Sequence, residues 1–300
     1  MSAPTASTGP LAPAPEQTPG PPRPVHPARF PLLLLGTVLA LALIAYGALT
    51  IVILMTRHSA PVASADYGTG ITSIRVESWG LCGGGISVVG EAARTTVSAT
   101  WKDKWSLARP THSVRRDGSA LVLDVDCDWT TVWPPSVDVT LRVPRETALA
   151  LQNDSGEVTV SSIVGDVTVS SDSGGVEATG IRGDVELHTD SGSVTATDVD
   201  GDLDLRTDSG SIRAYGARAS RVTLRTDSGS QRVALTTVPD EVTATSDSGS
   251  VTVLVPGDAS YAVTTSSDSG SRRVRVDEDP AAASIITART DSGSILIGSG

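Results

Sequence analysis

One triplet, Asp-Ser-Gly, occurs eight times in the second half of the sequence and constrains the fold more than any other feature. Successive copies are 18, 18, 18, 19, 20, 21 and 23 residues apart, at Asp154, Asp172, Asp190, Asp208, Asp227, Asp247, Asp268 and Asp291. Eight copies cannot be eight active sites, and self-similarity at such a period is typical of a solenoid or another repeat array.

Apolar residues alternate within each unit. The positions four and six residues after the Asp hold, in the first copies, Val158 and Val160, Val176 and Ala178, Val194 and Ala196. A Gly-Asp pair then opens a second alternating run, with Val167 and Val169, Val185 and Leu187, Leu203 and Leu205. Period-two alternation indicates short strands, so each unit supplies two strands and two tight bends.

No single unit can bury its apolar edge, whereas units stacked in parallel about 4.8 Å apart can. We predict an all-β fold, a parallel β-helix or β-solenoid with about 18–23 residues per coil and a right-handed wind. The left-handed hexapeptide helix is the alternative. It ranks second because its aliphatic residue recurs every six positions, whereas the apolar spacing here is uneven.

Each triplet is expected to form a turn in which the Asp accepts the Gly N–H and the Gly permits the bend. The predicted turn glycines are Gly156, Gly174, Gly192, Gly210, Gly229, Gly249, Gly270 and Gly293. Stacked carboxylates repel by about 1 to 3.5 kcal/mol, which charge-assisted bonds of about 1.5 to 3 kcal/mol offset without a metal. A calcium ladder at Asp172, Asp190 and Asp208 is the alternative.

Two copies place a polar residue, Gln231 or Arg272, where the others have an apolar one. We expect these coils to be shifted by two residues, so that Val233 and Val274 take the buried position; a place at the sheet margin is the alternative. The chain then stops at "SILIGSG", which predicts an uncapped sheet edge through which copies of the protein could associate.

The N-terminal segment is of another kind. Residues 1–31 contain ten prolines, typical of a disordered, partly polyproline-like tail, with a ligand for an SH3-like partner as the alternative. Residues 32–55 have no charge and are long enough to cross a hydrocarbon core of about 30 Å. We predict an uncleaved transmembrane helix; a signal peptide has a shorter apolar region, about 7–15 residues.

Charge and cysteines indicate the location of the remaining chain. Arg23 and Arg29 precede the helix and Arg57 follows it, which favours a cytoplasmic N-terminus and an extracellular C-terminal domain. Cys82 and Cys127, the only cysteines, are expected to form a disulfide on that oxidising side. Residues 59–300 carry 20 basic and 33 acidic residues, which excludes a nucleic-acid partner. No cofactor is predicted.

We expect a linker at residues 56–68, a β cap at 69–140 and the solenoid at 141–300. The cap holds a predicted hairpin turn at 115–119 and all the tryptophans, Trp79, Trp101, Trp105, Trp129 and Trp133. Large aromatic side chains are mostly buried, so we expect packing, with a tryptophan binding platform as the alternative.

Residues 137–176 read "VDVTLRVPRETALALQNDSGEVTVSSIVGDVTVSSDSGGV". A run ending in Val143-Pro144, followed by repeated Ser-Gly plus Val and Gly-Asp plus Val units, resembles the bacterial "putative adhesin" family of β-strand repeat domains, also classed as a domain of unknown function. The resemblance covers residues 140–300 well and 70–140 loosely. It implies a β-solenoid at the cell envelope and brings no catalytic residues with it.

No catalytic centre is predicted. A Ser nucleophile needs a base within reach, and the nearest histidine to the coils, His188, is expected to point outward into solvent. Two functions remain: an anchored, non-catalytic, adhesin-like module that contacts an envelope polymer or a surface protein, and a signalling or envelope-stress accessory. The accessory would sense a ligand outside and bind a cytoplasmic partner through its tail.

Overall fold

The computed structural model describes residues 29–55, 57–80, 82–106, 108–127 and 135–300. Most of the predicted tail, together with Trp129 and Trp133, lies outside these ranges. The chain divides into two compact units, Met1–Val52 and Ile53–Gly300. The described part of the first unit belongs to helix α1 (Arg29–Met55), which contains an apolar stretch, Leu34–Val52, long enough to cross a membrane.

The second unit consists of two β-sheets. The first sheet has 13 strands: β1 (His58–Ser59), β2 (Ala63–Thr69), β4 (Ile86–Glu91), β5 (Thr96–Trp105), β8 (Ser136–Pro144), β10 (Val158–Ser161), β12 (Val176–Thr179), β14 (Val194–Thr197), β16 (Ile212–Ala217), β18 (Gln231–Leu235), β20 (Val251–Val255), β22 (Arg272–Arg275) and β25 (Ile295–Ser299). The second sheet has 12: β3 (Ser73–Ser78), β6 (Thr111–Asp117), β7 (Ala120–Asp126), β9 (Ala148–Ser155), β11 (Val167–Ser173), β13 (Val185–Ser191), β15 (Leu203–Ser209), β17 (Arg221–Ser228), β19 (Glu241–Ser248), β21 (Ser260–Ser269), β23 (Asp277–Glu278) and β24 (Ile285–Ser292).

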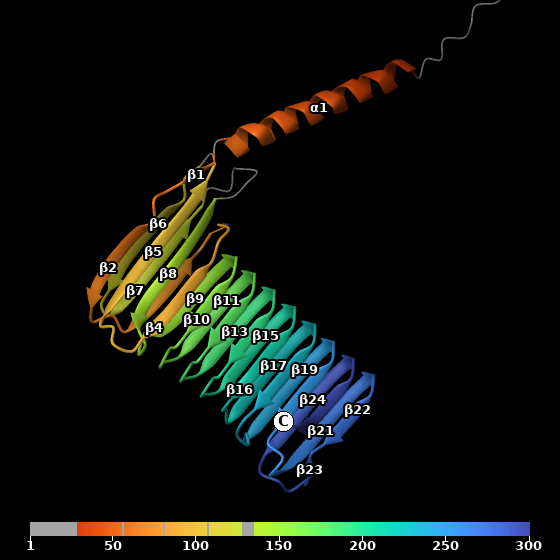
Figure 1. The fold of residues 1–300 in the computed structure, drawn as a ribbon. Coiled ribbons are helices and arrows are strands. Elements are labelled where there is room, and N and C mark those ends of the chain that lie inside the picture. Colours follow the sequence, from red (N-terminus) through yellow and green to blue (C-terminus); the bar gives the residue numbers. More distant parts are fainter. Residues whose placement is uncertain (1–28, 56, 81, 107, 128–134) are drawn as a thin grey trace, which may run out of the picture. The chain divides into compact units, whose positions relative to one another are not determined.

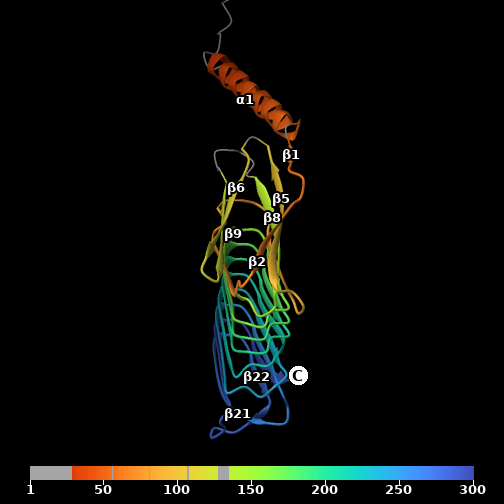
Figure 2. The same ribbon diagram turned by 90° about the vertical axis from the view of Figure 1, so that its left-hand side faces the viewer.

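Each repeat contributes one strand to each sheet, and successive repeats stack as coils along the unit (Figure 1). Neighbouring coils pair in parallel and in register, so Val176 of β12 lies between Val158 and Val194. Alternate side chains point inward and are almost fully buried between the two sheets, which face each other in Figure 2. The predicted all-β solenoid with two strands per unit is confirmed.

The Asp-Ser-Gly turns place glycine where no side chain fits. Gly174 has a φ of 133°, and a Cβ built there would overlap the carbonyl oxygen of Gly156 in the preceding coil. The contact recurs at the triplet glycine of every later coil, and it begins where Gly156 itself approaches the carbonyl of Gly84. The Gly174 N–H in turn donates to the Ser191 carbonyl at 2.9 Å. The turn backbones are therefore stacked as closely as the strands.

The expectation that the final strand forms the C-terminal sheet edge is wrong. The last two strands, β24 and β25, insert between β19–β20 and β21–β22, so that β22 rather than β25 forms the edge of the first sheet. The inward positions explain this order. Ala288 and Ile295 are at most 1% exposed, whereas β21–β22 has Thr265 and Arg272 in the matching positions. The edge strand β22 reads RRVR, and such charge disfavours pairing with another copy.

The predicted two-residue shift is also wrong. Gln231 pairs in register with its neighbours in β16 and β20 and is 1% exposed. Its Nε2 donates to the Thr245 carbonyl at 2.6 Å, so the donor side of this buried amide is hydrogen-bonded. Arg272 is unshifted as well, but it lies in the outermost coil, where it is exposed and donates to the Thr265 carbonyl at 3.1 Å. For Arg272, the alternative of a place at the sheet margin is correct, because β22 is the edge strand of the first sheet.

Both sheets continue through the boundary expected at residue 140, because the coil β3–β4 lies between β7–β8 and β9–β10. The antiparallel strands β5 and β6 follow outside β8 and β7, and the predicted hairpin joins β6 to β7. The residues expected to form a linker contain β1 and β2, which pair with β5. Cys82 and Cys127 form a disulfide with their Cα atoms 5.4 Å apart.

Two adjacent glycines provide a matched test of the close contact at the turn. Gly174→Ala should lower the free energy of unfolding by about 2 kcal/mol or more, because the new Cβ meets a backbone oxygen. Gly175→Ala should change it by less than about 0.5 kcal/mol, since a Cβ there reaches only the Ser193 carbonyl, at 3.8 Å. Urea unfolding followed by circular dichroism measures both variants, and equal losses would contradict the contact.

Candidate interaction surface

In six of the eight copies, the hydroxyl of the residue before the triplet fastens the turn to the neighbouring coil. Thr189 Oγ1 donates to the Gly174 carbonyl at 3.2 Å, and Thr207 Oγ1 donates to the Gly192 carbonyl at 3.0 Å. The same bond is made by Thr226, Ser246, Ser267 and Thr290. Asn153 starts this buried ladder. It is 2% exposed, and its Nδ2 donates to the carbonyl of Gly156 in its own turn.

The predicted bond from the triplet Asp to the Gly N–H is a wrong assignment, because the Gly N–H donates to a serine carbonyl of the next coil. Aspartate fastens the other turn, the Gly-Asp turn, instead. The Oδ1 atoms of Asp166 and Asp184 accept the N–H groups of Asp184 and Asp202 at 3.1 and 2.9 Å. Asp202 Oδ1 accepts the Arg221 N–H at 2.8 Å. The triplet aspartates are therefore not needed to hold the coils together.

We call the eight triplet aspartates the Asp row. All except the half-buried Asp154 are exposed. The one ion pair to this row in the described ranges joins His188 Nε2 to Asp190 Oδ1, 3.2 Å apart. Burial, and then the charge of Asp172, raise the pKa of the Asp154 carboxyl. No three His, Cys, Asp or Glu side chains within the described ranges come together as metal ligands, so Asp172, Asp190 and Asp208 are not gathered into a calcium site.

A row of basic side chains runs beside the Asp row on the outer face of the second sheet. His188, Arg206 and Arg225, which we call the basic row, pair in register across β13, β15 and β17. Together with Asp208 and Asp227 they line a shallow hollow of about 420 Å³. Arg225 has no ion pair within the described ranges. Each basic residue stands two positions before a triplet Asp, a regularity that is visible in the sequence.

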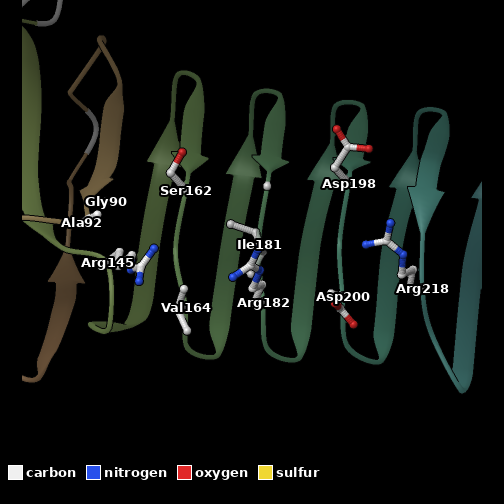
Figure 3. A pocket seen from close by; sticks show the side chains of 11 residues that line it. Gly90, Ala92, Arg145, Ser162, Val164, Ile181, Arg182, Asp198, Asp200 and Arg218 are labelled. Atoms are coloured by element: carbon white, nitrogen blue, oxygen red, sulfur yellow. The ribbon is translucent and has the colours of Figure 1, made fainter.

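A second hollow follows the turns that lead from the first sheet to the second (Figure 3). Arg145, Arg182 and Arg218 line it together with Asp198 and Asp200. Along this line the backbones of successive coils form isolated parallel β-bridges. One bridge joins Arg182 to Asp200 and the next joins Asp200 to Arg218. Since the charges alternate from coil to coil, this hollow offers no continuous stretch of one sign.

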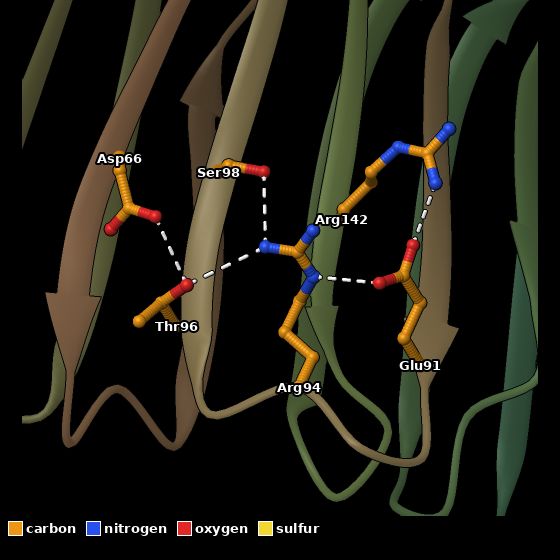
Figure 4. A network of polar contacts seen from close by, with 6 residues as sticks. All are labelled: Asp66, Glu91, Arg94, Thr96, Ser98 and Arg142. Carbon is orange, nitrogen blue, oxygen red and sulfur yellow. Dashed lines mark hydrogen bonds and ion pairs between the residues drawn. The ribbon is translucent and has the colours of Figure 1, made fainter.

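A network of ion pairs and hydrogen bonds occupies the N-terminal end of the first sheet (Figure 4). Glu91 accepts Arg94 Nε at 2.9 Å and Arg142 Nη1 at 2.7 Å, and both arginines lower the pKa of its carboxyl. Thr96 Oγ1 donates to Asp66 Oδ2 at 3.0 Å. The network joins β2, β4, β5 and β8. Its charged groups therefore bind one another within the unit.

The described tryptophans divide into two kinds. Trp79 and Trp101 are 0% and 3% exposed, as the packing prediction requires, and Trp101 stacks on His112 with ring centres 4.2 Å apart. Trp105 is half-buried at the end of β5, with the Arg109 guanidinium 5.2 Å from its ring centre. Packing therefore accounts for two of the described tryptophans, whereas Trp105 is partly exposed to solvent.

The family model of the Toastrack DUF4097 domain matches residues 131–296, more than half of the sequence. The chain belongs to this family, which confirms the resemblance to an adhesin-like β-repeat domain of unknown function. No curated protein matches the sequence.

Two solved structures are similar to the chain. A putative cell adhesion protein from Clostridium sporogenes is 8% identical over 80% of this chain and 100% of that chain, with a TM-score of 0.29. A putative adhesin from Bacteroides fragilis is 14% identical over 80% and 97%, with a TM-score of 0.42.

The two kinds of aspartate should differ in stability measurements. Asp202→Ala removes the acceptor of the Arg221 N–H and should lower the free energy of unfolding by about 1 to 2 kcal/mol. Asp208→Ala removes no hydrogen bond and should change it by less than about 0.5 kcal/mol. Urea unfolding of the two variants measures the difference. A larger loss for Asp208→Ala would show that the Asp row is structural after all.

Asp154 should make stability depend on pH. Its pKa is higher in the folded protein than in the unfolded chain, so the folded state binds the proton more tightly. The protonated carboxyl contributes stability at low pH. This contribution is lost as the pH rises from the pKa of Asp154 in the unfolded chain through its pKa in the folded protein. Asp154→Asn should therefore raise the melting temperature at pH 7, and the gain should vanish below about pH 3.9. A gain that persists at lower pH would contradict this cause.

Proposed function

We propose that the chain is a membrane-anchored, exported and non-catalytic interaction module of adhesin-like type, with its N-terminus in the cytoplasm and its β-rich unit outside the cell. The apolar length of α1 supports the anchor. The disulfide between Cys82 and Cys127 suits an oxidising compartment. Membership of the Toastrack DUF4097 family supports an extended repeat domain rather than an enzyme.

The outer face of the second sheet is the surface that supports this function best. One observation carries the proposal: the basic row and the Asp row run side by side, in register, from coil to coil. Parallel strands are about 4.8 Å apart, so the face presents both charges at a regular spacing. A partner with regularly spaced charges, such as an extended envelope polymer or a strand-rich surface protein, fits such a face. His188 contacts an aspartate rather than a serine hydroxyl, which is why we assign binding and not catalysis.

Matched pairs of arginines allow the face to be tested. Arg206→Ala/Arg225→Ala removes two charges from the basic row, and Arg213→Ala/Arg232→Ala removes two from neighbouring coils on the outer face of the first sheet. The full chain in lipid nanodiscs should bind isolated cell-envelope fractions. Arg206→Ala/Arg225→Ala should bind them at least about tenfold more weakly, because each lost charge contact contributes roughly 1 kcal/mol or more.

The second variant should bind like the wild type. Equal weakening in both variants would show that net charge, not this face, determines binding. Absence of binding by the wild-type chain to any envelope fraction would overturn the proposed function.

A further inference from the structure

Basic and aromatic side chains gather around β1, the first strand after α1. Strand β1 pairs with the end of β5, which places His58 opposite Trp105 and Ser59 opposite Lys104. The rings of His58 and Trp105 are 5.8 Å apart, and the Arg109 guanidinium lies 5.2 Å from the Trp105 ring. Arg57, His58, Lys104 and Trp105 line a hollow of about 370 Å³. We call these four residues and Arg109 the juxtamembrane cluster.

Chain length limits how far this cluster can be from the end of α1. Two residues separate Met55, the last residue of the helix, from His58. An extended chain spans at most about 3.6 Å per residue, so the two Cα atoms are within roughly 11 Å of each other. The pairing of β1 with β5 then keeps Lys104 and Trp105 beside His58. A membrane-spanning α1 therefore keeps the cluster near the depth of the lipid headgroups.

The chemistry of the cluster differs from that of the surrounding unit. Residues 59–300 carry 20 basic and 33 acidic residues, so the unit as a whole is repelled by an anionic surface. Within the described ranges Arg57 and Arg109 have no ion pair, and Lys104 has one exposed partner, Asp138, at 3.6 Å. Basic side chains beside a membrane attract anionic lipid, and tryptophan favours the membrane interface. The cluster combines both properties.

We propose that the juxtamembrane cluster docks on the phosphate groups of anionic lipids in the leaflet around the outer end of α1. The inference rests on the proposed anchoring by α1 and adds a second contact with the same membrane. Arg57, Lys104 and Arg109 supply the charge, and Trp105 supplies an amphipathic ring held in place by Arg109. The docked cluster keeps the β1–β5 end of the unit at the bilayer.

The test uses the full chain in nanodiscs of phosphatidylcholine, with or without phosphatidylglycerol, that carry a nitroxide on the lipid headgroup. Subtracting the Trp105→Phe variant isolates the quenching of Trp105 fluorescence. Phosphatidylglycerol should increase this quenching.

Lys104→Ala/Arg109→Ala should lower the docking equilibrium constant by roughly 30-fold, because it removes two basic residues from the surface. Arg273→Ala/Arg275→Ala, which removes the same charge from β22, should leave it unchanged.

A salt titration of the wild type needs no variant, and about 0.5 M salt should remove the part of the quenching that depends on phosphatidylglycerol. Equal quenching with and without phosphatidylglycerol would overturn the inference. An equal response to inorganic phosphate in phosphatidylcholine nanodiscs would show a site for free anions and would overturn it too. Extraction of the chain from native membranes by alkaline carbonate would instead refute the anchoring itself, so the two failures are distinguishable.

Discussion

The close approach of one turn backbone to the next is the contact on which the β-rich unit depends. Parallel strands can pair in register only if the turns between them repeat with the same spacing, and here the Cα of each triplet glycine lies against the glycine carbonyl of the preceding coil. Any side chain at that point would push the turns apart, and the strands on both sides would lose their pairing. The buried threonine and serine hydroxyls then bond to these same carbonyls. One atom, the glycine carbonyl oxygen, thus sets both the spacing and the capping of the turn.

Burial, not order in the chain, determines which coils lie at the ends. The last coil in the sequence is inserted one place inward because its isoleucines and alanine fill the core, and the coil before it, with Arg272 facing inward, takes the end where a charge can reach water. At the other end the coil β3–β4 is likewise enclosed by β7–β8. At the C-terminal end of the second unit, the coil with exposed arginines thus covers the coil with buried isoleucines.

The sequence was sufficient to predict the elements that depend on local repetition. Period-two alternation predicted both strands of each coil, the triplet spacing predicted the stack, and Gly118 in "RRDGS" predicted the hairpin. The insertion of β24–β25 could not be read in this way, because it depends on a comparison of burial energies between coils. The role of the Asp row was wrong for a similar reason. A local rule assigned Asp to the Gly N–H, but a carbonyl of the neighbouring coil, distant in sequence, is the acceptor.

The Asp row then requires a reason other than stability. The residue before the triplet varies among Asn, Ser and Thr, and the residue two before it varies among Gln, Ser, His, Arg and Thr, yet the Asp itself is the same in all eight copies. Neighbouring carboxylates about 4.8 Å apart repel by about 1 kcal/mol in water, and within the described ranges one histidine alone pairs with the row. The Asp recurs in all eight copies although it makes no hydrogen bond that holds the coils together, which fits the proposed contact with a partner outside the chain. The regular spacing that the turn glycines impose on the backbone is also the spacing at which such a partner would meet these charges.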